Sequence, residues 1–257
     1  MEFIVIALAA LFISGLTLFS GFGLGTLLLP FFALFFPPDV AVALTAIVHL
    51  LNNLFKLVLL GRKADRTVVL QFGIPAILAS FAGAGSLLWL SGTNPLYQYV
   101  FRGQTYSVMP LKVVIALLMI VFALFEIVPR LARLSFDRRY LAMGGALSGF
   151  FGGLSGHQGA LRSAFLLRAD LSPEGFIATG VVIACLVDFA RVPVYLLHFA
   201  ASDFHTSAPF LLVAVFAAFL GAFIGNRILR KVTMQYVQII VALLLFLIAL
   251  GLGAGWI

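Results

Sequence analysis

The sequence predicts an all-α integral membrane protein with two inverted repeats, each a re-entrant, glycine-split helical hairpin followed by three transmembrane helices. Composition is the first reason. Of the 257 residues, 63% are hydrophobic and 10% are charged, whereas soluble domains carry about 45–50% apolar and about 25% charged residues. The second reason is a series of apolar runs long enough to cross a bilayer. The third is that the order of these runs occurs twice, which indicates an internal duplication.

The apolar runs are of two lengths. Six have roughly the 17–25 residues of one membrane crossing, and they lie at 42–60, 68–90, 111–128, 175–199, 207–226 and 234–256. The runs 3–36 and 140–168 are longer, and each has a cluster of glycines near its middle. Non-helical backbone at membrane depth needs surrounding protein or a water-filled cavity. We therefore expect each long run to be a hairpin that opens one repeat, the first at 1–134 and the second at 135–257.

Equivalent residues in the two halves support the duplication. In one register, Pro38, Asp39, Asn53 and Lys56 align with Pro173, Glu174, Asp188 and Arg191. After a gap of one residue, Gly25 and Thr45 align with Gly159 and Thr179.

Basic loop residues indicate how the long runs lie in the membrane. If both runs crossed the bilayer, Lys and Arg would be divided almost evenly between the two sides. If both are hairpins, every basic loop except the one with Arg102 and Lys112 lies on the cytoplasmic side. The cytoplasmic loops are then 61–67, 129–140, 168–175 and 226–233. The positive-inside rule favours this second arrangement, in which the two halves are inverted.

Composition and motifs also limit the expected partners. The formal net charge is +7, but the basic residues lie in short loops between apolar runs, which fits membrane orientation better than nucleic-acid binding. The chain has no P-loop, no His/Cys cluster with structural zinc spacing and no dinucleotide-binding fingerprint. We therefore expect no cofactor, no metal, no catalytic residues and no nucleic acid. Inverted repeats with interrupted helices point instead to a transport site near the bilayer midplane.

Two stretches carry a family resemblance. "GFGLGTLLLPFFALFFPPDVAVALTAIVHLLNN" resembles the first signature region of the TauE/SafE family of sulfite and sulfur-compound exporters, and "GGLSGHQGALRSAFLLRADLSPEGFIATGVVIACLVDFARVPVY" looks like its second copy. The resemblance covers nearly the whole chain. It implies a multi-pass permease of a bacterial inner membrane for sulfite, a sulfonate or a related sulfur-containing or organic anion. The family often has a glycine triplet in both copies, whereas here the glycines are spaced apart.

The glycine turns are the first candidate substrate-binding site. They consist of Gly21, Gly23 and Gly25 in the first half and of Gly156 and Gly159 in the second. Helix N-termini that start at these turns would direct free N–H groups at an anion. The alternative is close helix packing, for which small residues are common in membranes.

Polar side chains follow the second turn only. Arg162 would supply a bidentate fork to an oxoanion, or it could extend towards the cytoplasmic face. His157 could contact substrate or carry a proton, or it could hold the turn together as a neutral imidazole. Gln158 would be a neutral donor to the substrate.

Asp188 and Arg191 lie on one face of the expected helix 175–199. Asp188 could accept a coupling proton, with Arg191 setting its proton affinity or binding the anion. Alternatively, the two could be a structural pair whose charges neutralise each other. Thr45 and Thr179 begin matched helices, and their hydroxyls could reach a substrate oxygen or bond their own backbone.

The matching region of the first half contains Asn52, Asn53, Lys56 and His49. The two asparagines are candidates for substrate binding. Lys56 could support the site or extend to the cytoplasmic surface. His49 lies one turn before Asn53 and could line the same cavity or merely pack.

The ionisable residues expected deep in the membrane are mostly basic: Lys56, Arg162 and Arg191 against Asp188. This excess predicts a secondary transporter for a small anion, with alternating access at a midplane site and coupling to protons or membrane potential. A permease for a cation or a neutral solute is the first alternative. An intramembrane enzyme that uses His157 and Asp188 as acid and base is the second.

Overall fold

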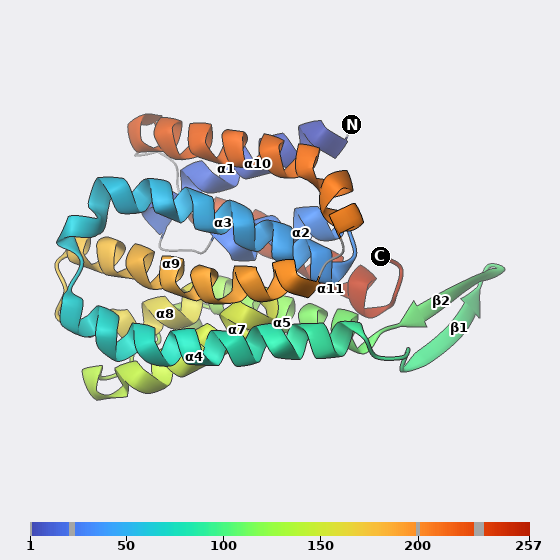
Figure 1. The fold of residues 1–257 in the computed structure, drawn as a ribbon, viewed down its shortest axis with the longest axis horizontal. Coiled ribbons are helices and arrows are strands. Elements are labelled where there is room, and N and C mark those ends of the chain that lie inside the picture. Colours follow the sequence, from blue (N-terminus) through green and yellow to red (C-terminus); the bar gives the residue numbers. More distant parts are fainter. Residues whose placement is uncertain (1, 21–23, 199–200, 229–233) are drawn as a thin grey trace.

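The computed structural model describes the chain except for residues 1, 21–23, 199–200 and 229–233. It is a bundle of helices that run along one long axis, with a two-stranded hairpin at one end (Figure 1). The first half contains α1 (Glu2–Ser20), α2 (Leu24–Ala33), α3 (Pro38–Leu60), the short 3-10 turn η1 (Gly61–Lys63), α4 (Arg66–Ser91), β1 (Tyr97–Phe101), β2 (Gln104–Val108) and α5 (Pro110–Ile127). After it come α6 (Pro129–Ala132), η2 (Arg138–Tyr140), α7 (Leu141–Ser155), α8 (Gly159–Leu166), α9 (Pro173–His198), α10 (Ala201–Ile228) and α11 (Met234–Gly253).

Helices in the described part of the chain are long enough for a bilayer. Three of them, at Pro38–Val58, Arg66–Ser91 and Pro173–His198, are long and apolar enough to cross a membrane by length and composition. The outer face of α4 illustrates the surface they present. Its exposed side chains include Leu70, Ile74, Leu78, Phe81 and Trp89. Such a continuous apolar stripe fits lipid contact, because soluble proteins rarely expose large apolar patches.

The segment between α4 and α5 is a β-hairpin, which the sequence analysis did not anticipate. β1 and β2 pair antiparallel, with Tyr97 opposite Val108. Arg102 and Gly103 form the turn, and both have positive φ values, of 51° and 80°, as tight hairpin turns require. The Tyr99 hydroxyl donates to the Ala254 carbonyl at 2.8 Å and joins the hairpin to the C-terminal end of α11. Among the residues that the structure describes, this hairpin is the one β-structure in a helical fold.

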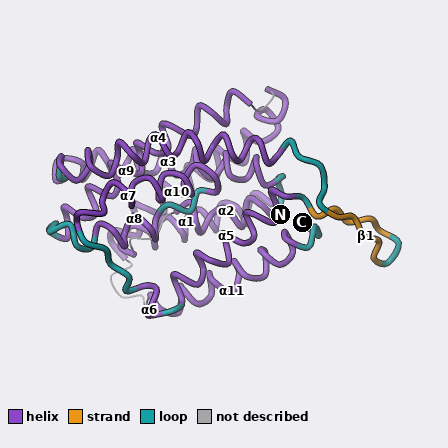
Figure 2. The backbone as a smooth tube through the Cα atoms, turned by 90° about the horizontal axis from the view of Figure 1, so that it is seen from below, coloured by secondary structure: helices purple, strands orange, loops and turns teal. Residues whose placement is uncertain are grey.

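The pair α1–α2 begins and ends at the same end of the bundle. The rings of Phe3, near the start of α1, and Phe36, just after α2, both contact Phe210 of α10. Their centroids lie 3.9 and 5.3 Å from that of Phe210. The chain thus enters along α1 and returns along α2. Both chain termini and the β-hairpin lie at this same end (Figure 2).

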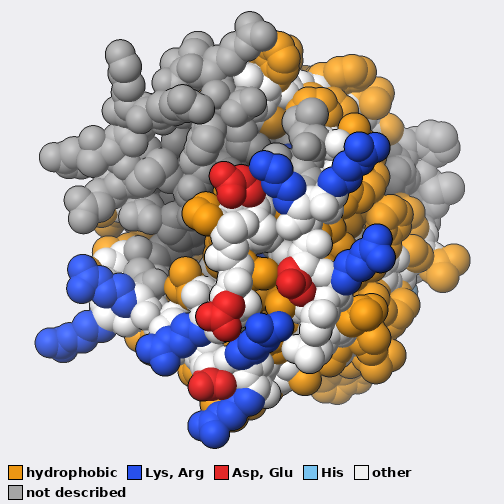
Figure 3. Space-filling view, turned by 90° about the vertical axis from the view of Figure 1, so that its left-hand side faces the viewer, with side chains coloured by type: hydrophobic (Ala, Val, Ile, Leu, Met, Phe, Trp, Pro, Cys, Tyr) orange, Lys and Arg blue, Asp and Glu red, His pale blue; other side chains and the backbone are white. Residues whose placement is uncertain are grey.

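The pair α7–α8 begins and ends at the opposite end. The Phe136 N–H, before α7, donates to the Ala164 carbonyl in α8 at 3.1 Å, and Arg138 lies 3.8 Å from Asp170. The end of α3 also lies at this end of the bundle. Asp65 follows α3, and its N–H donates to the hydroxyl of Thr179, near the start of α9, at 3.0 Å. Figure 3 views this end and shows Lys, Arg, Asp and Glu side chains gathered on it.

Glycines let α7 pack directly against the backbone of α4. A Cβ added at Gly149 would lie 2.1 Å from the Ala76 carbonyl oxygen, and one added at Gly153 would lie 2.2 Å from the Ser80 carbonyl oxygen. Small residues permit this approach between membrane helices. The close helix packing that glycines permit is therefore present between α7 and α4. It involves glycines within α7, which precede the turn at Gly156.

Candidate functional site

Gly25 and Gly156, one from each glycine cluster, approach each other in the interior. Gly156 ends α7 with φ of 83°, a left-handed conformation that favours glycine. Its carbonyl oxygen would lie 3.2 Å from a Cβ added at Gly25, in the first turn of α2. Gly25, Gly156 and Gly159 are all buried. Gly21 and Gly23 lie outside the described residues.

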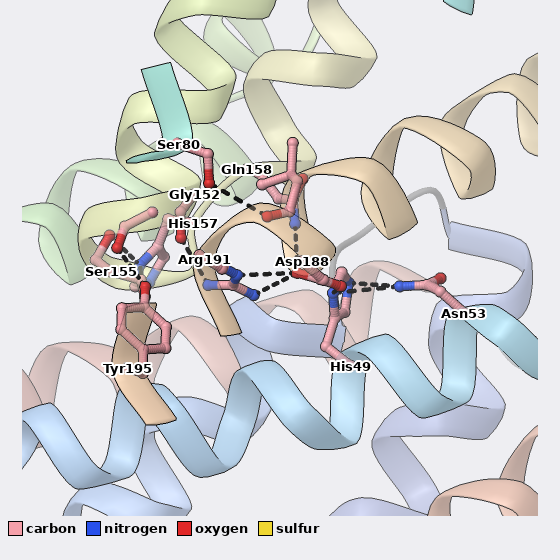
Figure 4. Close-up of polar contacts among 12 residues, drawn as sticks. His49, Asn53, Ser80, Gly152, Ser155, His157, Gln158, Asp188, Arg191 and Tyr195 are labelled. Carbon is pink, nitrogen blue, oxygen red and sulfur yellow. Dashed lines mark hydrogen bonds and ion pairs between the residues drawn. The ribbon is translucent and has the colours of Figure 1, made fainter. Parts of the chain in front are cut away.

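Asp188, on α9, is the centre of the polar cluster next to these turns. Its Oδ1 accepts from Arg191 Nε at 2.9 Å and lies 2.8 Å from Arg191 Nη2. Its Oδ2 lies 2.6 Å from Nδ1 of His49 on α3. Figure 4 shows Asp188 between the two side chains. The Asp188–Arg191 pair is thus formed within one helix, and His49 extends it to a helix of the first half.

Gln158 connects this cluster to α8. Its Nε2 donates to Asp188 Oδ1 at 3.3 Å, and its Oε1 accepts from Arg162 Nη1 at 3.3 Å. Its own carbonyl accepts from the Ser148 hydroxyl at 3.0 Å. The amide of Gln158 therefore joins a carboxylate and a guanidinium, and the backbone at the turn is anchored to α7.

The interior carries an excess of positive charge. Among the described residues, the buried groups with a full charge are Lys56, Arg162, Arg191 and Asp188, three positive against one negative. Arg191 is paired with Asp188, which leaves Lys56 and Arg162 without a carboxylate of their own among the side chains that the structure describes. These two lie close enough to act on each other electrostatically. Buried charges without partners are costly, so this pair favours an anion between or beside them.

The start of α8 adds backbone donors to this region. The Arg162 N–H donates to the Gln158 carbonyl at 3.0 Å. The N–H groups of Gly159, Ala160 and Leu161 precede this bond, and the first N–H groups of a helix lack acceptors within it. Together with the helix dipole they favour negative charge. Arg162 lies on the same short helix.

Arg191 and Tyr195 hold the C-terminal end of α7. Arg191 Nη1 donates to the Gly152 carbonyl at 2.6 Å, and the Tyr195 hydroxyl donates to the Gly153 carbonyl. A cation at a helix C-terminus interacts favourably with its dipole. Sequence reasoning missed Tyr195, although its position four residues after Arg191 places both on one helix face.

His157 is fully buried and bonded within the turn. Its Nδ1 lies 3.1 Å from the Ser155 carbonyl and 3.0 Å from the Ser155 hydroxyl. Its ring stacks on Phe122 of α5 at 5.1 Å between centroids. Its Nε2 has no hydrogen-bond partner in the described part of the chain. Nδ1 of His157 thus makes the hydrogen bonds within the turn, and Nε2 is available to bind another group.

The remaining candidates of the first half lie along α3. Asn53 Nδ2 lies 3.1 Å from Nε2 of His49, and Asn52 Oδ1 accepts from the Ser14 hydroxyl of α1 at 3.0 Å. The Asn52 amide nitrogen and the Thr45 hydroxyl are buried without a partner among the described residues. Both groups lie on α3, the helix that also carries Lys56.

The Thr179 hydroxyl makes its hydrogen bond outside this cluster, although a Cβ added at the adjacent Gly180 would lie 3.5 Å from Arg162 Nε. The hydroxyl of Thr179 accepts the Asp65 N–H at 3.0 Å, and the Asp65 carboxylate in turn accepts the Val68 N–H at 2.8 Å to cap α4. The structure therefore places Thr179 at the charged end of the bundle. Its sequence equivalent Thr45 lies near Gly25, where its Cγ2 would be 3.8 Å from an added Cβ.

Long apolar helices with lipid-facing stripes around a buried, positively charged interior define a multi-pass membrane protein with a polar centre. The family model of the sulfite exporter TauE/SafE matches residues 3–252. The chain therefore belongs to the TauE/SafE family and is a membrane transporter of that family, as the resemblance in its sequence predicted. No curated protein and no solved structure matches the chain.

Proposed function

We propose that this protein is a secondary transporter for sulfite, a sulfonate or a related small sulfur-containing or organic anion across a bacterial inner membrane. It works by alternating access of two inverted repeats, 1–134 and 135–257, at a site near the bilayer midplane. The observation that carries this proposal is the pair of buried cations Lys56 and Arg162, which act on each other electrostatically and have no carboxylate of their own among the described side chains.

The packing of the helices supports two inverted repeats. In the alignment of the halves, α4 corresponds to α10 and α7 to α1. The helix α4 packs against α7, while α10 packs against α1, so each half covers the other half's hairpin. Both pairs of helices are packed through a glycine against a backbone carbonyl. A Cβ at Gly83 would lie 2.0 Å from the Phe150 carbonyl oxygen, and a Cβ at Gly221 would lie 2.0 Å from the Leu11 carbonyl oxygen.

The two re-entrant hairpins, α1–α2 and α7–α8, open at opposite ends of the bundle in this proposal. Their ends are held by Phe3 and Phe36 at one end and by Arg138 and Asp170 at the other. An anion near Gly25 and Gly156 would therefore be reached along one hairpin from outside and along the other from the cytoplasm. Rocking of the halves about such a site is the usual way in which inverted repeats give alternating access.

The substrate would contact Arg162, Lys56 and the first N–H groups of α8. The guanidinium offers two parallel donors to an oxoanion, and Lys56 supplies a second positive charge. Asn52, Asn53, His157 and Gln158 would complete the polar surroundings, and Asp188 with Arg191 would hold the turn in place. Transport is coupled to protons or to the membrane potential.

Ligand binding tests this proposal through the two cations. Wild-type protein, Arg162→Gln and Lys56→Gln are compared in a thermal-shift screen with sulfite, sulfate, thiosulfate, sulfonates and carboxylates. Hydrogen bonds to charged groups contribute about 1.5–3 kcal/mol, so we expect Arg162→Gln to weaken the binding of the preferred anion about tenfold or more. Arg168→Gln is the matched control, because it removes an exposed arginine from the loop after the same hairpin.

The same screen separates the alternatives. Stabilisation by cations or neutral solutes, with no response to any anion, would overturn the proposal in favour of another class of permease. A ligand that is chemically changed by the protein in detergent would indicate an enzyme instead.

A further inference from the structure

We propose that His49 binds the proton that is coupled to anion transport, and that the hydrogen-bonded chain His49–Asp188–Gln158–Arg162 links this proton to the anion. The proposal rests on the proposed function, because it assumes that an anion binds at Arg162. It assigns to α3 of the first half a coupling residue that acts on the site through α9 of the second half.

The contacts of His49 leave one ring position for a proton. A carboxylate only accepts hydrogen bonds, so His49 Nδ1 donates to Asp188 Oδ2 across 2.6 Å. In the neutral ring, Nε2 then carries a lone pair, and Asn53 Nδ2 lies beside the ring, 3.1 Å from Nε2 and 3.2 Å from Nδ1. A proton that binds His49 is added at Nε2. Asn53 can accommodate it by turning its amide, so that its oxygen accepts the new N–H.

A continuous chain of hydrogen bonds runs from His49 to the anion site. Asp188 bonds His49 through one oxygen and receives the Gln158 amide on the other, at 3.3 Å. The Gln158 oxygen then accepts from Arg162 Nη1, also at 3.3 Å. An anion that draws Arg162 towards itself weakens the bond to Gln158. The amide is then free to interact more closely with Asp188.

The charges around His49 determine the direction of this coupling. Asp188 and Arg191 on α9 and Arg162 on α8 act on it electrostatically, and Lys56 lies on its own helix. The whole of α2 and residues 208–224 of α10 contain no titratable side chain. The described titratable side chains of α4 and α5 are Arg66, which begins α4, and Lys112, which donates to the Ile257 carbonyl at the β-hairpin end.

A proton on His49 therefore joins a region that is already positive, and a bound anion offsets this repulsion. Anion and proton consequently favour each other. By linkage, the anion raises the affinity for the proton by the same factor as the proton raises the affinity for the anion. Transport of both in the same direction is the expected result.

The other described histidines are placed differently. His157 is bonded to Ser155 and stacked on Phe122, and its contacts do not extend to Asp188. His198 lies at the end of α9 and is exposed. Histidine is the side chain that normally changes charge between about pH 5 and 8, so substitution of these three residues one at a time can separate their roles.

Proton uptake on anion binding tests the proposal directly. Sulfate or methanesulfonate is added to purified protein in weakly buffered detergent solution, and a pH indicator reports the protons taken up. Sulfate and methanesulfonate are chosen because neither anion changes charge in the pH range of interest. Sulfite does change charge in that range. We expect wild-type protein to take up protons with each probe it binds. The affinity of wild-type protein for the probe should rise about fivefold or more as the pH falls from about 8 to about 5. A fivefold change is about the low end of typical coupling between two sites.

His49→Gln should bind the probe without proton uptake and with an affinity that no longer depends on pH. His198→Gln should behave as wild type in both measurements, and His157→Gln should still take up protons with each probe that it binds. Undiminished uptake in His49→Gln, or its loss in His157→Gln alone, overturns the proposal. Wild-type protein that binds a probe without proton uptake also overturns it, whether or not any variant folds, and leaves the proposed function intact. If wild-type protein binds neither probe at any pH, this proposal fails, and the proposed function fails with it only if none of the anions in the thermal-shift screen binds either.

Discussion

The Gly156 carbonyl oxygen faces Gly25 so closely that a Cβ at Gly25 would lie 3.2 Å from it. The two glycines are far apart in sequence, and their contact brings the start of α2 against the end of α7. In the proposed mechanism this contact is where the two halves meet beside the anion. Changes at the contact should therefore affect transport more than stability.

A large side chain at Gly25 should separate the two turns. In Gly25→Leu the added atoms would meet Gly156, and also Thr45 and His49 at 3.8 and 3.9 Å from the Cβ. We expect anion flux in proteoliposomes to fall about tenfold or more, because a small displacement at a site can have such an effect. Gly85→Leu is the control, since an added Cβ there has no atom within 4 Å. Equal flux in both variants would show that the turns need not touch.

The glycines that pack each half against the other should be equally sensitive. Gly83→Ala and Gly221→Ala each place a Cβ 2.0 Å from a carbonyl oxygen of the opposing helix. Overpacking of this kind costs typically about 1–3 kcal/mol, so both variants should have lower melting temperatures in detergent. Gly85→Ala should melt as wild type. A normal melting temperature for either Gly83→Ala or Gly221→Ala would contradict the proposed equivalence of the two contacts.

The Asp188–Arg191 pair should stabilise the protein mainly by mutual neutralisation. Removal of one partner from a buried pair costs about 3–5 kcal/mol, because the other charge is left uncompensated. We therefore expect Arg191→Met to reduce the free energy of unfolding by about this amount. The double variant Asp188→Leu, Arg191→Met should lose less, as measured by denaturant unfolding in detergent. If the double variant is no more stable than Arg191→Met, the pair does not act in this way.

Membrane orientation can be tested by labelling single cysteines after Cys185, the one cysteine in the sequence, has been replaced by alanine. Pro37→Cys lies after the first hairpin and Arg168→Cys after the second, and both positions are exposed. An impermeant maleimide added to intact cells should label Pro37→Cys alone, and Arg168→Cys should react only after the membrane is opened. Labelling of both from the same side would be incompatible with inverted repeats.

Much of the fold follows from patterns that are local in sequence. The apolar run 68–90 corresponds to α4 at Arg66–Ser91, and the run 111–128 corresponds to α5 at Pro110–Ile127. Hydrophobic length alone indicates such helices. The β-hairpin was missed because its strands have only five residues each. The pair Arg102-Gly103 was the available signal for its turn.

The candidate site is less accessible to sequence reasoning. Asp188 and Arg191 could be paired in advance, since residues three apart share a helix face. The contact between His49 and Asp188 joins residues 139 positions apart, and no helical spacing predicts it. Tyr195 was overlooked for a related reason, because its partner is a backbone carbonyl of another helix.

Anion flux into sealed proteoliposomes tests the central claim most directly. Labelled sulfite and a labelled sulfonate are supplied outside vesicles that contain wild-type protein, Arg162→Gln or Arg168→Gln at equal levels. The account predicts that wild-type protein and Arg168→Gln accumulate at least one of these anions chemically unchanged, and that Arg162→Gln loses about tenfold or more of this flux. Undiminished anion flux in Arg162→Gln, or flux of cations alone in wild-type protein, would contradict it.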